Sequence, residues 1–165
     1  MTISDLDIKK IAVQLGRPPR NSLAVVARGE CGNPVVVKTK PRLEDGTPFP
    51  TLYYLTCPKL NSKIGTLEAA GFMKDLETTL AEDKNLLENY RAAHKDYLSE
   101  RESIEEVSEI SGISAGGMPS RVKCLHSLAA HSLAKGVGVN KVGDLVLERI
   151  KSWCEIPCVD DEDLI

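Results

Sequence analysis

The feature that most constrains the fold of this chain is a change in the spacing of its apolar residues near residue 58. Before it, three short segments rich in β-branched and aromatic residues predict strands over 22–28, 35–39 and 51–57. After it, apolar residues recur at the three- and four-residue spacing of amphipathic helices. Because the predicted strands follow one another through short connections, they favour an antiparallel sheet.

Capping residues and glycines place the ends of the predicted helices. The expected N-caps are Ser4, Asn61 or Ser62, Asp83 and Asn140. Helices are expected over residues 4–15, 61–70, 72–80, 83–101, 119–134 and 141–153, whereas residues 102–113 are polar and fit neither pattern. The sequence therefore predicts an α+β fold, with a small antiparallel sheet of three strands near the N-terminus packed against a layer of helices. Residues 1–159 are expected to form one domain, and residues 160–165 an acidic C-terminal tail.

The composition is that of a globular protein. The 165 residues are 42% hydrophobic and 27% charged, with a net charge of −3. The negative balance argues against nucleic-acid binding. One feature favours nucleic-acid binding, namely a local set of cations that comprises Lys38, Lys40, Arg42, Arg121 and Lys123.

The sequence gives no sign of a membrane or secretory segment. It has no run of about 18 apolar residues and no cationic N-terminal region followed by an apolar one. A cytoplasmic location is expected, where disulfides are rare. The five cysteines are then buried core residues, metal ligands or nucleophiles.

Residues 114–132, SAGGMPSRVKCLHSLAAHS, concentrate more reactive residue types than any other segment. Glycines before a helix start let backbone N–H groups approach a ligand, and the helix N-terminus attracts anions. This predicts an anion-binding site for a phosphate or carboxylate. Its residues are Gly116, Gly117, Ser120, Arg121 and Lys123. The alternative is a flexible loop before a helix that begins at Pro119.

Cysteines and histidines suggest a second site. Cys31 lies in a turn, Cys57 ends a strand, and Cys124 and His131 are seven residues apart on one predicted helix face. With His126 they form a candidate zinc or iron–sulfur site. A regular helix would set His126 opposite Cys124, so both could ligate one ion only if the first turn is distorted. No CxxC pair is present, so the site requires residues that are distant in sequence to converge.

Other roles for these side chains stay open. The cysteines could be structural, and Cys124 or Cys57 could be a thiol nucleophile. His94 lies between Tyr90 and Tyr97 at helical spacing, where it could act as a general base or pack as a buried side chain. Cys154 and Cys158 form a CxxxC pair that is a weak metal candidate.

Several segments resemble a bacterial family known as domain of unknown function 501. They are PRLEDGTPFPTLYYLTCP (41–58), LEAAGFM (67–73), YRAAHKDYL (90–98), GGMPSRVKCLHSLAAHSLA (116–134) and GVNKVGD (138–144). The chain departs from it at Asn140-Lys141, where similar sequences often have asparagine-proline. The resemblance falls on the predicted cysteine and histidine ligands. It implies no reaction, but such proteins tend to be encoded near enolase, a septum-formation protein and an exopolyphosphatase-like protein.

Two functions are therefore considered. The first is a Cys/His metal or iron–sulfur site beside an anion-binding helix N-terminus, performing metal-assisted hydrolysis or group transfer on a small phosphorylated or carboxylated ligand. The alternative is a non-enzymatic interaction module whose protein partners belong to the cell-division or envelope machinery.

Overall fold

The computed structural model describes residues 3–164 and confirms the α+β fold. Strands β1 (Ser22–Arg28), β2 (Pro34–Thr39) and β3 (Tyr53–Leu55) form one antiparallel sheet in the order β1-β2-β3. The α-helices are α1 (Asp5–Leu15), α2 (Pro58–Ala69), α3 (Phe72–Glu82), α4 (Lys84–Ile104), α5 (Leu125–Lys135) and α6 (Lys141–Ile150). Two short 3-10 helices are η1 (Ser108–Ile110) and η2 (Asp161–Leu164), and η2 packs against α1.

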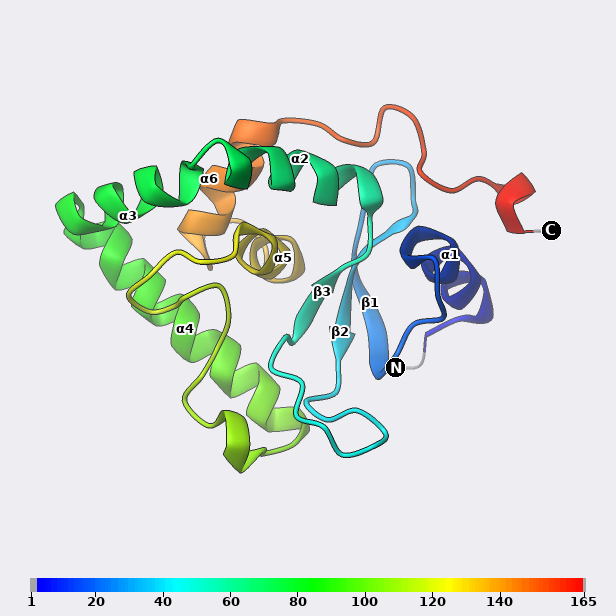
Figure 1. Cartoon of the computed structure of the whole chain (residues 1–165), viewed down its shortest axis with the longest axis horizontal. Coiled ribbons are helices and arrows are strands. Elements are labelled where there is room, and N and C mark those ends of the chain that lie inside the picture. The colour runs from blue at the N-terminus through cyan, green and yellow to red at the C-terminus, as the bar shows by residue number, and fades with distance from the viewer. Residues whose placement is uncertain (1–2, 165) are drawn as a thin grey trace.

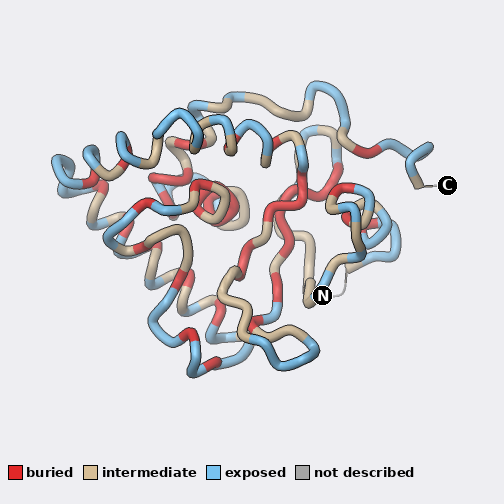
Figure 2. The backbone as a smooth tube through the Cα atoms, viewed as in Figure 1, coloured by how far each residue is buried: buried red, intermediate tan, exposed pale blue. Residues whose placement is uncertain are grey.

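The sheet lies between helices on both of its faces. Helix α5 contacts all three strands, whereas α1 contacts β2 from the opposite side, as Figure 1 shows. Strand β2 pairs Val36 with Leu55 and Val37 with Tyr54 of β3, and it is buried along almost its whole length. A strand covered on both faces needs a continuous apolar run, and Val35-Val36-Val37 supplies it. Buried residues accordingly follow β2, β3 and α5 in Figure 2, whereas β1 is of intermediate burial.

Buried polar side chains fix the connections around this core. The hydroxyl of Tyr97 on α4 accepts a hydrogen bond from Leu52 N at 2.6 Å, which joins the helix to the segment before β3. Arg101 is 2% exposed, and its guanidinium donates to the carbonyl oxygens of Pro50, Ile110 and Ile113. The bonds to Ile110 and Ile113 hold the polar segment 102–113, for which the sequence predicted no structure, and the bond to Pro50 joins α4 to the segment before β3.

Several element boundaries differ from the predictions. Strand β3 covers only residues 53–55. Helix α2 begins at Pro58 instead of near residue 61, because the Cys57 sulfur accepts from Leu60 N and proline suits the first helical position. Helix α6 ends at Ile150, three residues earlier than expected. The caps at Ser4, Asp83 and Asn140 are confirmed, each with its side chain bonded to a backbone N–H of the helix it precedes.

The largest correction concerns the predicted helix over 119–134, which begins only at Leu125. The preceding residues form a compact turn in which Gly116 and Gly117 have φ angles of 66° and 94°. The Gly116 carbonyl accepts from Lys123 N at 2.7 Å, and the Gly117 carbonyl accepts from Arg121 N at 2.8 Å. These bonds use the backbone groups that a helix from Pro119 would need.

Within residues 3–164, no helix is both long enough and apolar enough to cross a membrane.

Gly143 of α6 lies directly against the backbone of α5, and this contact has a testable consequence. A Cβ atom on Gly143 would lie 2.1 Å from the Leu128 carbonyl oxygen, whereas one on Gly65 of α2 would meet nothing within 4 Å. We expect Gly143→Ala to lower the free energy of unfolding by about 2 kcal/mol or more, because the two helices must separate. Gly65→Ala should raise it by about 0.5–1 kcal/mol through helix propensity. Urea unfolding of the two variants measures both changes, and a stabilised Gly143→Ala would contradict this packing.

Candidate functional site

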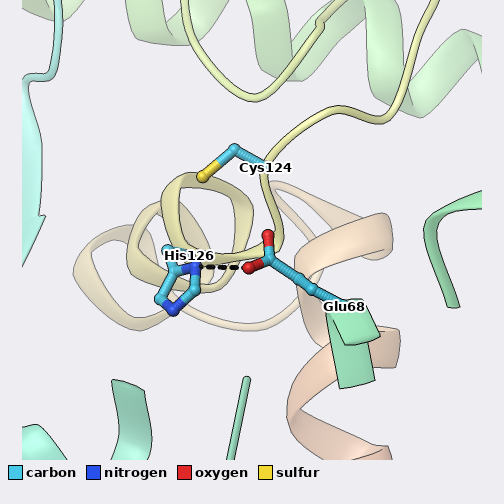
Figure 3. Close-up of side chains that lie close together, drawn as sticks. All are labelled: Glu68, Cys124 and His126. Carbon is cyan, nitrogen blue, oxygen red and sulfur yellow. Dashed lines mark ion pairs between the residues drawn. The ribbon is translucent and has the colours of Figure 1, made fainter. Parts of the chain in front are cut away.

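Three potential metal ligands converge where α2 meets the start of α5. Glu68 comes from the last turns of α2, Cys124 directly precedes α5, and His126 lies in the first turn of α5. One ligand atom from each residue lies within 4.8 Å of the other two, and no other group of three or more Cys, His, Asp or Glu side chains in residues 3–164 does so. Figure 3 shows the Cys124 sulfur and the Glu68 carboxylate directed toward the same side of the His126 ring.

The late start of α5 is what brings Cys124 and His126 together. Cys124 has an extended backbone, with φ −143° and ψ 108°, and it occupies the N-cap position. The helical rotation that would set it opposite His126 therefore does not apply. From the sequence, Cys124 and His126 could ligate one ion only if the first helical turn were distorted. The structure has this distortion, because Cys124 is an extended N-cap residue.

Each of the three side chains is also held by a second partner. Leu125 N donates to Glu68 Oε2 at 3.1 Å, and the Ser127 hydroxyl donates to the Cys124 sulfur at 3.5 Å. His126 Nε2 lies 3.2 Å from the Asn61 carbonyl oxygen, to which it can only donate. The other ring nitrogen, Nδ1, lies 3.1 Å from Glu68 Oε1. Nδ1 is therefore the His126 atom that faces the cluster.

The electrostatics of the cluster favour a charged pair. The pKa of His126 is raised above its usual value, first by its interaction with Cys124 and further by the charge of Glu68, although partial burial opposes the shift. Burial disfavours the Cys124 thiolate, but interactions with His126 and Ser127 outweigh it and lower the pKa of the thiol. Without a metal, the site therefore tends toward an imidazolium beside a thiolate.

A pocket of about 270 Å³ opens onto Cys124 and His126. It lies between β3 and the first turns of α2 and α5, so the sheet edge and two helix starts form its walls. Its lining is neutral apart from the two reactive side chains, and consists of Thr51, Tyr53, Tyr54, Leu55, Asn61, Cys124, His126 and Ser127. The cluster is thus accessible from one side to a small molecule.

The structure places the other predicted cysteine ligands away from this cluster. Cys31 contacts Cys154, with 3.7 Å between their sulfur atoms. Cys57 is 2% exposed and caps α2, and burial raises the pKa of its thiol to about 11. Among the described residues, Cys31 and Cys57 do not join Cys124 in a group with metal-ligand spacing. Cys158 accepts a hydrogen bond from the Gln14 amide at 3.3 Å.

His131 is a core residue. It is fully buried, its ring stacks on Tyr53 with 5.6 Å between centroids, and Tyr97 meets it edge-on. The Asn140 amide donates to Nδ1 at 3.2 Å, and Nε2 donates to Asp96 at 2.9 Å. Burial lowers the pKa of His131 despite the opposing carboxylate of Asp96, so the ring is neutral at pH 7. Both ring nitrogens are occupied by protein partners.

His94 also has a protein partner. Its Nδ1 lies 2.7 Å from the Ser114 hydroxyl, and partial burial lowers the pKa of the ring. Its neighbours Tyr90 and Tyr97 are fully buried, and the Tyr90 hydroxyl donates to the Arg121 carbonyl at 2.6 Å. This stripe holds α4 against the turn before α5.

The protein's own carboxylates occupy much of the predicted anion site. Glu77 accepts from the Arg121 guanidinium and from Val122 N, both at 3.1 Å, and Glu68 accepts from Leu125 N at the true helix start. Gly116 and Gly117 form the turn described above. Ser120 and Lys123 lie outside the helix and are exposed. The predicted residues are neighbours in the structure, but the described chain already supplies anions to Arg121 and to the helix N-terminus.

Sequence reasoning missed Glu68 and gave Asn61 only a capping role. Glu68 is one of two charged residues on the helix predicted over 61–70, and a single carboxylate on a helix face gives no sign of a ligand role. Its one distinguishing mark is its place in LEAAGFM, a segment that carries the family resemblance but contains no cysteine or histidine.

Comparison with known proteins identifies a family but no close relative of known activity. A family model described as "Protein of unknown function (DUF501)" matches residues 25–148, which include the whole cluster. No curated protein and no solved structure matches the chain.

The pKa of His126 provides a test of the cluster. Glu68→Gln removes the carboxylate charge but keeps an oxygen that can accept from Leu125 N, so we expect it to lower the pKa of His126. Because the folded protein holds this proton more tightly than the unfolded chain, its contribution to stability is complete below about pH 6.5 and is lost as the pH rises through the folded-state pKa. Proton NMR titration of the histidine rings measures the pKa of His126.

Glu82→Gln, at an exposed position of α3, is the control and should leave the pKa of His126 unchanged. An unchanged pKa of His126 in Glu68→Gln would contradict the pairing of His126 with Glu68.

Proposed function

The chain belongs to the DUF501 family, whose description assigns no activity, and we propose from its own side chains that Glu68, Cys124 and His126 bind one zinc ion at a catalytic site. The observation that carries the proposal is the second partner of each ligand. The Asn61 carbonyl, Leu125 N and the Ser127 hydroxyl hold the three side chains from outside the cluster. Metal ligands in proteins are typically oriented in this way.

The ligand types favour zinc. One thiolate, one imidazole nitrogen and one carboxylate oxygen suit a borderline-soft ion, and three protein ligands are typical of catalytic zinc sites that keep a position open. Zinc ligands lie about 2.0–2.3 Å from the ion, so tetrahedral coordination sets two ligand atoms about 3.3–3.8 Å apart. His126 Nδ1 and Glu68 Oε1 are 3.1 Å apart, and all three ligand atoms lie within 4.8 Å of one another. An iron–sulfur cluster is less suited, because it relies on several thiolates and this cluster supplies one.

The tautomer of His126 supports the same assignment. Since Nε2 donates its proton to the Asn61 carbonyl, Nδ1 is the nitrogen with a lone pair to offer when the ring is neutral. In the imidazolium–thiolate form of the cluster, metal binding would displace the proton that Nδ1 holds beside Glu68. Affinity should therefore rise with pH.

The proposed reaction is hydrolysis or group transfer on a small phosphorylated or carboxylated substrate. Bound zinc would polarise the substrate's carbonyl or phosphoryl oxygen as a Lewis acid. The 270 Å³ pocket suits a small molecule, and Tyr54, Asn61 and Ser127 in its lining offer polar groups that can orient one. The neutral lining supplies no cation, so an anionic substrate group would depend on the metal for its counter-charge.

A second candidate is thiol catalysis by Cys124. It is favoured by the thiolate–imidazolium tendency of the metal-free cluster beside an open pocket. The two candidates make opposite predictions about zinc. As a ligand, Cys124 is protected from alkylation by zinc, whereas as a nucleophile it has no need of the metal.

We expect the purified protein to bind one zinc ion per chain, measured by isothermal titration and by metal analysis after dialysis. Cys124→Ser, His126→Ala and Glu68→Gln should each weaken binding by at least about tenfold, because the first two remove a ligand atom and the third removes the charge of one. Zinc-loaded protein should hydrolyse activated phosphate or carboxylate esters, and these variants should lose that activity.

The controls are Cys31→Ser and His94→Gln, which change the same residue types outside the cluster and should bind zinc as the wild type does. Equal zinc affinity in all five variants would contradict the proposal. Rapid iodoacetamide modification of Cys124 that zinc does not slow would favour thiol catalysis. Absence of both zinc binding and thiol reactivity would favour the non-enzymatic interaction module.

A further inference from the structure

A pair of cysteines far apart in the sequence meets on the side of the molecule where the chain returns after α6. Cys31 lies in the turn between β1 and β2, and Cys154 lies in the segment after α6. Their sulfur atoms are 3.7 Å apart, and both residues are partly exposed. Neither belongs to the proposed zinc site. The pair is therefore separate from the function proposed above.

Several contacts from the rest of the chain fix Cys154 in this place. On α2, Lys59 and Lys63 donate to the carbonyl oxygens of Ile156 and Ser152, which flank Cys154 on both sides. The Asn33 amide, two residues after Cys31, donates to the Val159 carbonyl at 2.8 Å, and Val159 is 2% exposed. The segment after α6 is thus held against α2 and the β1–β2 turn by side-chain hydrogen bonds. Figure 1 shows it crossing from α6 toward α1.

The residue at position 29 leaves space for the contact. A Cβ atom on Gly29 would lie 2.3 Å from the Cys154 sulfur and 3.5 Å from the Cys31 sulfur. Any larger side chain there would push Cys154 away. Glycine at this position is what allows the two thiols to touch.

We propose that Cys31 and Cys154 form a site of reversible thiol oxidation, at which a small disulfide such as oxidised glutathione converts the pair to a disulfide. The thiolate of one cysteine attacks a glutathione sulfur, forming a mixed disulfide and releasing one glutathione thiolate. The second cysteine then attacks the protein sulfur of that mixed disulfide and releases the other glutathione. The two protein thiols lose two protons and two electrons, and one oxidised glutathione becomes two reduced ones.

The bond would fasten the segment after α6 to the sheet. Cys31 and Cys154 are 123 positions apart, so the cross-link closes a loop that spans most of the chain. A long closed loop restricts the unfolded chain and stabilises the folded state. The oxidised protein is thus expected to unfold at a higher temperature than the reduced protein, and a thiol reductant reverses the change.

The test uses the full-length reduced protein incubated with oxidised glutathione, followed by alkylation of free thiols and peptide mapping by mass spectrometry. We expect one intramolecular bond, between Cys31 and Cys154, no cross-link among the remaining three of the five cysteines, and a raised unfolding midpoint. Cys31→Ser and Cys154→Ser should each abolish the disulfide and the rise in the unfolding midpoint. Cys124→Ser should retain both, because Cys124 has no part in the pair.

Gly29→Ala keeps all five thiols but displaces Cys154, so it should form the cross-link at least about tenfold more slowly than wild type. Equal rates of cross-link formation in Gly29→Ala and the wild type would overturn the proposal. So would glutathione retained on Cys31 without a cross-link, or a bond that joins Cys154 to Cys158 or Cys57 to Cys158 instead.

Discussion

The Glu68 carboxylate is the contact on which the candidate site depends. One oxygen accepts from the first backbone N–H of α5, and the other faces His126 Nδ1 one residue later. A helix N-terminus carries partial positive charge, so a carboxylate there stabilises the start of the helix at Leu125. That start leaves Cys124 extended at the N-cap, with its sulfur beside His126. The same side chain thus stabilises the start of α5 and is one of the three proposed zinc ligands.

The two histidines of α5 show how environment separates residues that look alike in sequence. His126 lies in the first turn at the wall of a pocket, with a thiol and a carboxylate near one nitrogen. His131 lies between two tyrosines with both nitrogens bonded to protein, and burial keeps it neutral. Arg101 and Tyr97 follow the pattern of His131, because their polar atoms hold backbone groups near the core. A polar residue with every partner inside the protein contributes to architecture, whereas the pocket-facing cluster remains available to a ligand.

Much of the fold was predictable because its signals are local. The valines of β2, the caps at Ser4 and Asp83 and the change of apolar spacing near residue 58 act within a few positions. The site was only partly predictable. The sequence indicates Cys124 and His126 as ligands but predicts a helix from Pro119, because the turn at Gly116 and Gly117 that delays the helix depends on hydrogen bonds to residues 121 and 123. Glu68 was missed because it is 56 positions from Cys124, and only the packing of α2 on α5 brings them together.

The central claim is that Glu68, Cys124 and His126 hold a zinc ion, and X-ray absorption spectroscopy of the zinc-loaded protein tests it most directly. The account predicts one sulfur ligand at about 2.3 Å, with the remaining nitrogen and oxygen ligands at about 2.0–2.2 Å. Replacing Cys124 with serine should remove the sulfur contribution entirely. A zinc environment with no sulfur, or with two or more sulfurs, would contradict the assignment.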